Sequence, residues 1–237
     1  PNADTFGYRN GNRDDEYYTE GIFVGYRWFD SFGKTPAYPF GYGMSYTSFS
    51  IETMDAIVQE SEVTVTFRVT NTGEKYSGRE VVQLYVSAPE GRLDKPYQEL
   101  VAYAKKKKLK PGQSEDVAVS FSIDRMASYD EETAAWIWEK GSYIIRAGEH
   151  SRATKIAAVI RLKKESICRK LGNVLPLDCE MACIRADRSL YYSYLEEESE
   201  LAEAQVISIE EFQIEEGGDG LQKSQTEPEK QMSETDI

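Results

Sequence analysis

A strict two-residue alternation runs through the middle of the chain. In residues 63–70, VTVTFRVT, valine and phenylalanine alternate with threonine and arginine. Successive side chains of a β-strand point to opposite faces, so the pattern predicts a strand with one buried and one solvated face. The segment ends in Asn-Thr-Gly at residues 71–73, where these residue types favour a turn.

The same period recurs in other short segments that are separated by Gly, Pro and Asn. We predict strands at residues 80–86, 117–123 and 153–162, and a hairpin over residues 136–149 that turns near Lys140-Gly141. Short alternating strands with such turns are typical of an antiparallel β-sandwich, here of about seven strands. The predicted fold class is therefore mainly β.

Two different segments precede the alternating region. Residues 17–30 are apolar and compact, which we interpret as a buried strand flanked by Gly21 and Gly25. Residues 38–49, YPFGYGMSYTSF, then crowd aromatic rings and two glycines together, and Pro36 and Pro39 forbid a regular helix. We interpret this second stretch as a rigid, packed connector.

The last third of the chain differs in charge. Residues 1–164 carry 23 acidic and 22 basic side chains, whereas residues 165–237 carry 18 and 6, so nearly all of the net charge of −13 lies there. Apolar spacing predicts an amphipathic helix within residues 187–205, and the composition beyond Gly217 predicts disorder. We predict three units: residues 1–49, residues 50–163, and an acidic linker or tail at residues 164–237.

Several classes of partner and cofactor are disfavoured. An acidic chain repels phosphate backbones, so nucleic acid is not an expected partner, and no stretch has the ~20 apolar residues of a membrane span. Cys168, Cys179 and Cys183 lie in the acidic third with no clustered histidine, so we expect thiols and neither a metal site nor a cofactor. A folded part without cysteine is compatible with the cytoplasm or with bacterial secretion, and the start at Pro1 without Met suggests a piece of a longer protein.

The combined motifs resemble a known family. YTEGIFVGYRWFD (residues 18–30) followed by PAYPFGYGMSYTSF (residues 36–49) resembles the end of the α/β-sandwich domain in glycoside hydrolase family 3, of the β-glucosidase type. Three later segments are similar to the fibronectin type III-like domain of that family, in the same order: VTNTGEKYSGREVVQLYV, LKPGQSEDVAVSFS and YDEETAAWIWEKGSYIIRAGEHS. The resemblance covers residues 17 to 162, and the acidic third resembles no part of the usual layout. It could be a linker toward another domain, as in members with a swapped domain order.

The resemblance implies a role for the aromatic connector. In the family, a barrel domain and the α/β-sandwich domain together cleave β-linked sugars with retention, and the connector joins the second of these to the fibronectin-like domain. It therefore implies that the connector packs at a domain junction, whereas a sugar-stacking platform is the alternative, because aromatic faces also hold sugar rings. The junction residues are Tyr38, Phe40, Gly41, Tyr42, Gly43, Tyr46 and Phe49.

The catalytic pair of that family has no counterpart here. Its nucleophile lies in a Ser-Asp-Trp stretch, but none of the three tryptophans follows an aspartate. Glu20-Gly21 superficially resembles the acid/base motif, yet the residues after it belong to a later motif, and the lone His150 is a weak candidate for a triad. We therefore assign no catalytic residue, leave the substrate-binding residues unassigned, and expect this chain alone not to hydrolyse glycosides.

Three functions from different classes remain open. The preferred one is a non-catalytic portion of a family 3 glycosidase, with the remaining domains as partners and a β-linked oligosaccharide as the substrate of the parent. The second is a stand-alone module that binds polysaccharide or a cell surface through Tyr85, Tyr97, Trp136 or Trp138. The third is an assembly domain that docks further copies of the enzyme.

Overall fold

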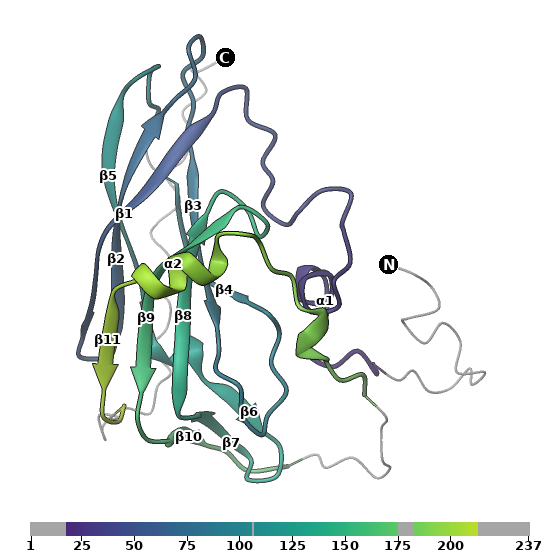
Figure 1. Cartoon of the computed structure of the whole chain (residues 1–237). Helices are drawn as coiled ribbons and strands as arrows, with labels where there is room; N and C mark the ends of the chain where they lie inside the picture. Colours follow the sequence, from purple (N-terminus) through teal and green to yellow (C-terminus); the bar gives the residue numbers. More distant parts are fainter. Residues whose placement is uncertain (1–17, 106, 175–182, 213–237) are drawn as a thin grey trace, which may run out of the picture.

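The computed structural model describes residues 18–105, 107–174 and 183–212, which form a β-sandwich with a few short helices (Figure 1). The helical elements are α1 (Tyr26–Ser31), η1 (Ile123–Met126), η2 (Arg188–Leu190) and α2 (Glu197–Glu203). The strands are β1 (Phe49–Gln59), β2 (Glu62–Asn71), β3 (Val81–Ser87), β4 (Glu99–Lys105), β5 (Ser114–Ser122), β6 (Ser128–Asp130), β7 (Ala135–Trp138), β8 (Gly141–Gly148), β9 (Thr154–Leu162), β10 (Ser166–Lys170) and β11 (Val206–Ile209).

Two sheets face each other across one core. The smaller has the order β1-β2-β5, and the larger has the order β11-β9-β8-β3-β4. A third sheet, β10-β7-β6, lies at one end of the sandwich (Figure 1). Among the described strands every pair is antiparallel except β11 with β9, so the predicted fold class is confirmed and the predicted number of strands is too low.

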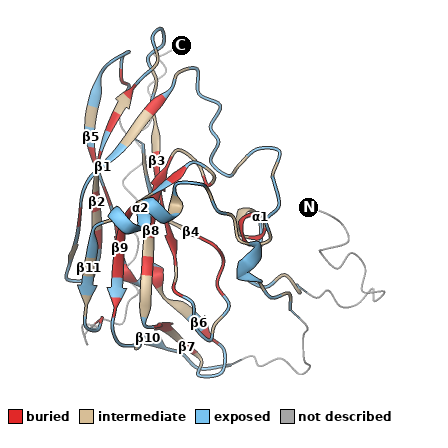
Figure 2. Cartoon of the chain, in the orientation of Figure 1, coloured by how far each residue is buried: buried red, intermediate tan, exposed pale blue. Residues whose placement is uncertain are grey.

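The alternation in β2 works as predicted. Val63, Val65, Phe67 and Val69 are buried in the core, and the residues between them are more exposed. Figure 2 shows that buried and more exposed positions alternate with one another along the strands of the sandwich. Each buried side chain of this size contributes roughly 1.5–3 kcal/mol relative to an exposed one. The inward residues of β5, at positions 117, 119 and 121, repeat the pattern on the neighbouring strand.

Strand β3 is buried on both faces. Val82, Leu84 and Val86 point into the sandwich core, as their spacing predicts. Gln83 and Tyr85, on the opposite face, are buried as well. The outer face of the larger sheet is therefore covered, and the segments that cover it are the N-terminal residues and the acidic third.

The predicted hairpin over residues 136–149 is wrong. Strand β7 pairs with β6 and β10, whereas β8 pairs with β3 and β9, so the chain changes sheets between them. Glu139, in this connection, is buried and forms an ion pair with Lys95. That interaction holds the connection against the loop that precedes β4, so it is not a free turn between paired strands.

The predicted strand at residues 17–30 is also wrong. Turns lead into α1, with Gly21 and Gly25 at φ of 53° and 59°, values that extended strands do not adopt. Phe23 and Trp28 are buried, while Ile22 and Val24 are exposed. A short apolar run does not distinguish a strand from a buried helix, which is why the pattern misled.

The acidic third folds back onto the sandwich as far as residue 212. The helix predicted within residues 187–205 is confirmed only for α2: the residues before it form the short η2 and no longer helix, and Leu190, Leu195 and Leu201 are exposed. We call residues 183–212 the strap. Its strand β11 joins the larger sheet, and Phe212 enters the core beside Trp138, with ring centroids 5.1 Å apart.

The predicted boundary between residues 163 and 164 stays a prediction, and the predicted disorder beyond Gly217 lies outside the described residues. No helix in the described part of the chain has the length and apolarity needed to cross a bilayer.

The first prediction concerns the contribution of the strap to stability. Phe212 is 5% exposed, so Phe212→Ala should lower the free energy of unfolding by about 3–5 kcal/mol through the cavity it leaves. Leu195→Ala, at a residue that is 98% exposed, should change it by less than about 0.5 kcal/mol. Urea unfolding of both variants checks this, and equal midpoints would show that the strap does not belong to the folded unit.

Candidate functional site

A buried ion pair joins α1 to the sandwich. Asp30, at the end of the helix, is 1% exposed, and its Oδ1 lies 2.5 Å from Nε of Arg152. Gln98 donates to Oδ2 of the same carboxylate at 3.1 Å and to the carbonyl of Ser151 at 2.6 Å. We call Asp30, Gln98, Ser151 and Arg152 the anchor.

The anchor also fixes the backbone around it. Arg152 donates through Nη2 to the carbonyls of Phe29 and Lys34, at 3.1 and 2.8 Å. On the other side, the backbone N–H of Tyr192 in the strap donates to the carbonyl of Asp30 at 2.8 Å, and the Arg152 guanidinium lies 4.0 Å from the Tyr192 ring centroid. One arginine therefore connects three segments of the chain.

Burial and the neighbouring charge shift the pKa of Asp30 in opposite directions. Removal from water raises the pKa of its carboxyl, and the neighbouring Arg152 and the Gln98 hydrogen bond lower it. Burial is the larger effect, so an unpaired carboxylate at this place would be costly. The arrangement suits a structural joint.

Further hydrogen bonds dock α1 along the start of β4. The hydroxyl of Tyr26 accepts from the Leu100 N–H at 2.7 Å, and Ser31 Oγ accepts from the Tyr97 N–H at 2.9 Å. Arg27 and Glu99 form an ion pair at 2.7 Å on the rim. The helix is held at both ends, and its position relative to the larger sheet is fixed.

The aromatic connector lies beside this joint, and we call residues 38–46 the aromatic loop. Phe40 stacks on Tyr26 with ring centroids 4.7 Å apart, and its carbonyl accepts from the Ser151 N–H at 3.0 Å. Gly41 adopts φ of 82°, and its carbonyl accepts from Nε2 of Gln83 at 3.3 Å. A Cβ at position 41 would collide with the Gln83 amide, so this position requires glycine.

The ring surfaces of the loop are largely open. Tyr46 is 91% exposed and Tyr38 is 69% exposed, and Met44 and Tyr42 are exposed as well. Tyr42 contacts Tyr38 and His150, with ring centroids 5.6 and 5.4 Å away. Contiguous exposed apolar side chains of this kind mark an interaction surface.

Phe49 differs from the other predicted junction residues. It is buried in the sandwich core at the first position of β1, whereas Gly43, with φ of 75°, lies in the exposed loop. The structure therefore brings Tyr38 and Tyr42 together, stacks Phe40 on Tyr26, and places Phe49 in the core. The assignment of these residues to a domain junction stays a prediction.

Sequence reasoning missed the anchor. Asp30 and Arg152 are 122 positions apart, and no local period links them. The available signal was a lone acidic residue that closes an apolar segment, since a buried carboxylate needs a partner.

The tyrosines and tryptophans proposed for a carbohydrate platform are poorly placed for it. Tyr85, Tyr97 and Trp138 are buried, and Trp136 is half-buried against Tyr129, with ring centroids 5.5 Å apart. A stacking platform must present a ring face to solvent, so these side chains do not form one.

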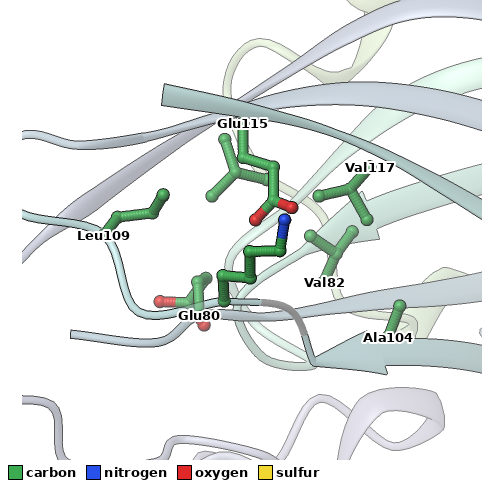
Figure 3. A pocket seen from close by; sticks show the side chains of 8 residues that line it. Glu80, Val82, Ala104, Leu109, Glu115 and Val117 are labelled. Atoms are coloured by element: carbon green, nitrogen blue, oxygen red, sulfur yellow. The ribbon is translucent and has the colours of Figure 1, made fainter. Parts of the chain in front are cut away.

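One pair of carboxylates lines a small cavity among β2, β3, β4 and β5 (Figure 3). Glu80 and Glu115 line it together with Val82, Leu109 and Val117. Burial raises the pKa of Glu80 to about 7, a value that suits a general acid, and Glu149 raises it further while the Val81 N–H and Lys105 oppose this. The cavity, however, is about 10 Å³, room for roughly one water molecule, so it does not admit a sugar ring.

Candidate metal ligands do not converge in the part of the chain that the structure describes, where no group of three or more His, Cys, Asp or Glu side chains could hold an ion. Cys168 and Cys183 are free thiols, and Cys179 lies outside the described residues. His150 Nδ1 accepts from the Arg152 N–H at 3.2 Å, and burial lowers the pKa of its imidazole. The neutral ring is bound to the backbone in a loop.

Replacement of Arg152 tests the anchor. Arg152→Met leaves Asp30 buried without its cation, so the free energy of unfolding at pH 7 should fall by about 3–5 kcal/mol. The loss should shrink as the pH is lowered, because Asp30 then takes up a proton. Arg161→Met, at an exposed position, is the matched control, and equal urea midpoints for both variants at pH 7 would contradict the role of the anchor.

Glu80 should make stability depend on pH. Its folded pKa is raised from 4.5 to about 7, so its contribution is fully present below pH 4.5 and is lost as the pH rises through 7. Glu80→Gln should therefore raise the melting temperature at pH 8 and leave it nearly unchanged at pH 4.5. Thermal unfolding across this range checks it, with exposed Glu74→Gln as control, and a constant difference at all pH values would contradict it.

The fold and the sequence are similar to those of known proteins. Residues 80–151 match the fibronectin type III-like domain. The β-glucosidase A of Butyrivibrio fibrisolvens is 39% identical over 189 residues, a match that covers 69% of this chain and 23% of that protein. The chain thus spans about a quarter of the length of this relative.

Solved structures give the same result. A β-glucosidase from Paenibacillus barengoltzii matches with a TM-score of 0.65 and 35% identity over 69% of this chain and 20% of its own. A GH3 β-glucosidase from Bifidobacterium adolescentis matches with a TM-score of 0.55 and 34% identity over 71% of this chain and 25% of its own. The chain therefore corresponds to the C-terminal region of β-glucosidase-type members of glycoside hydrolase family 3, with the fibronectin type III-like domain at its centre.

Proposed function

We propose that this chain is a non-catalytic portion of a family 3 glycoside hydrolase, and that it stabilises the catalytic domains of the parent enzyme. The relatives are β-glucosidases, and each is four to five times longer than the part matched here. The remaining domains of such a parent are the expected partner, and a β-linked oligosaccharide is the expected substrate of the parent.

The observation that carries the proposal is an exposed aromatic loop on a rigid base. Phe40 and Gly41 are fixed by backbone and amide hydrogen bonds, while Tyr38, Tyr42 and Met44 remain open to solvent. A surface that is already ordered loses little conformational entropy when a partner covers it. The loop therefore suits docking of a large apolar surface from a neighbouring domain.

We assign the hydrolysis of the glycosidic bond to the other domains of the parent enzyme and not to this chain. A retaining glycosidase needs two carboxyl groups about 5–5.5 Å apart in a site that admits the sugar. In the described residues burial raises the pKa of three carboxyl groups, those of Asp30, Glu80 and Glu149. Asp30 pairs with Arg152, and Glu80 lines a cavity of about 10 Å³ that does not admit a sugar ring. The role proposed for this chain is positional.

Reconstitution tests the proposal. The barrel and α/β-sandwich domains of the parent, expressed as a separate polypeptide, should bind this chain and gain activity on an aryl β-glucoside, whereas this chain alone should be inactive. The triple variant Tyr38→Ser, Tyr42→Ser, Met44→Ser should weaken binding at least about tenfold. The measurement is calorimetric titration together with release of the aryl group.

Tyr103→Ser is the matched control, because Tyr103 is an equally exposed ring on β4, outside the aromatic loop. It should bind as the unchanged chain does. Equal affinity of the triple variant and the control would contradict docking through the loop, and hydrolysis by this chain alone would contradict the non-catalytic role.

A further inference from the structure

The outer edge of β9 is covered by the strap. Strand β8 pairs with one side of β9, and the strap follows the other side. The N–H groups along that side find acceptors in turn: Ile156 N–H donates to Glu200 Oε2 at 2.9 Å, Val159 N–H to the Gln205 carbonyl at 2.8 Å, and Lys163 N–H to the Ile209 carbonyl at 3.1 Å. An edge that would otherwise be open is therefore paired over most of its length.

Side chains of the strap add to this pairing. Ile207 and Ile209 pack against the sandwich core, and Phe212 is buried in it. Val206 and Ser208 point outward. Apolar residues at alternate positions thus face inward, as a strand that completes a half-buried sheet requires.

Charge and amide contacts fix the register of β11. The Glu210 carboxylate lies 3.0 Å from Lys163 Nζ and 3.5 Å from Lys164 Nζ. At the other end, Gln205 Nε2 donates to the Ala56 carbonyl of β1 at 3.0 Å. Exposed ion pairs contribute little energy, but together with the amide they favour one alignment of the strand.

We propose that the β9 edge is a strand-accepting site, which β11 fills within one molecule and which the same segment of a second copy of the chain can fill when β11 is released. The strap residues that contact the β9 edge lie within residues 200–212, and every copy of the chain carries them. Main-chain pairing supplies affinity in strand addition, and pockets for alternate side chains supply specificity. Without the strap, the apolar segment Ala157-Ala158-Val159-Ile160 would be an unpaired edge strand, and such edges pair readily with another strand.

Two proline variants separate pairing from other effects. In a parallel pair of strands, every second residue directs both its N–H and its C=O toward the partner strand, and the residues between them direct these groups away. The carbonyls of Gln205 and Ile209 accept from β9, so Ile207 belongs to the same set, and the Ser208 N–H points away from it. Ile207→Pro should therefore release β11, whereas Ser208→Pro is the matched control, because proline is tolerated where the N–H faces solvent.

The probe is a fluorescent peptide with the sequence of residues 203–212, titrated into the full chain. The Ile207→Pro chain should bind it saturably and at least about tenfold more tightly than the unchanged chain or the Ser208→Pro chain, whose edge is occupied. The same peptide with proline at position 207 should not bind. Absence of saturable binding to a folded Ile207→Pro chain, or equal binding to all three chains, would overturn the proposal.

If Ile207→Pro fails to fold, hydrogen exchange of the backbone amides in the unchanged chain still tests whether the strap pairs with β9. The amides of Val159 and Lys163 should be protected, because both donate to the strap. Exchange of these two amides as fast as in an unpaired peptide would overturn the proposal.

Discussion

The Asp30–Arg152 ion pair is the interaction on which the arrangement of this chain depends. It joins a helix near the N-terminus, a loop after β8 and, through the carbonyl of Asp30, the strap. Taking both charges out of water is costly, so the pair stabilises the structure only while every partner is present. A joint of this kind is specific, because an alternative packing of α1 would leave a buried carboxylate without a cation.

The larger sheet has a polar outer face that is nevertheless buried, because the N-terminal segment and the strap cover it. The Tyr85 hydroxyl donates to Gln83 Oε1 at 2.6 Å, and Arg146 donates through Nε to Ser87 Oγ at 2.8 Å and through Nη2 to Glu197 at 2.5 Å. Buried polar groups need particular partners at particular distances, whereas apolar groups pack in many ways. The polar face thus directs the N-terminal segment and the strap to one position each. The acidic residues of the strap have a structural use there, although the sequence presents them as a charge-rich tail.

The alternation of apolar and polar residues predicted the central strands correctly. It failed where the structure depends on contacts between residues that are far apart in the sequence. The alternation in residues 63–70 and 117–123 predicted β2 and β5, because the inward side chains of these strands all meet one core, although Ile123 already belongs to η1. The aromatic and glycine pattern of residues 38–49 predicted a packed connector, whereas the structure leaves Tyr38 and Tyr46 exposed and buries Phe49 in the sandwich core. Neither the sheet change between β7 and β8 nor the pairing of β11 has a local signal, since each depends on a residue far away in the chain, Lys95 in one case and Val159 in the other. Asp30 and Arg152 belong to this second group.

The β9 edge and the aromatic loop both carry apolar side chains, but only the β9 edge is covered by another described segment. The β9 edge is covered by the strap, which supplies main-chain acceptors, inward isoleucines and a complementary carboxylate. Gln83 and Ser151 fix the backbone of the aromatic loop through hydrogen bonds to the carbonyls of Gly41 and Phe40. No described segment covers Tyr38, Met44 or Tyr46, which stay exposed. Had the loop been a flexible segment, its rings would collapse onto the nearest apolar surface. Because its backbone is fixed and glycine at position 41 allows close approach to Gln83, the rings are kept outward. Hydrogen bonds from Gln83 and Ser151 thus fix the backbone of the loop while its rings stay in solvent, and an ordered apolar surface of this kind is what the proposed docking of a neighbouring domain requires.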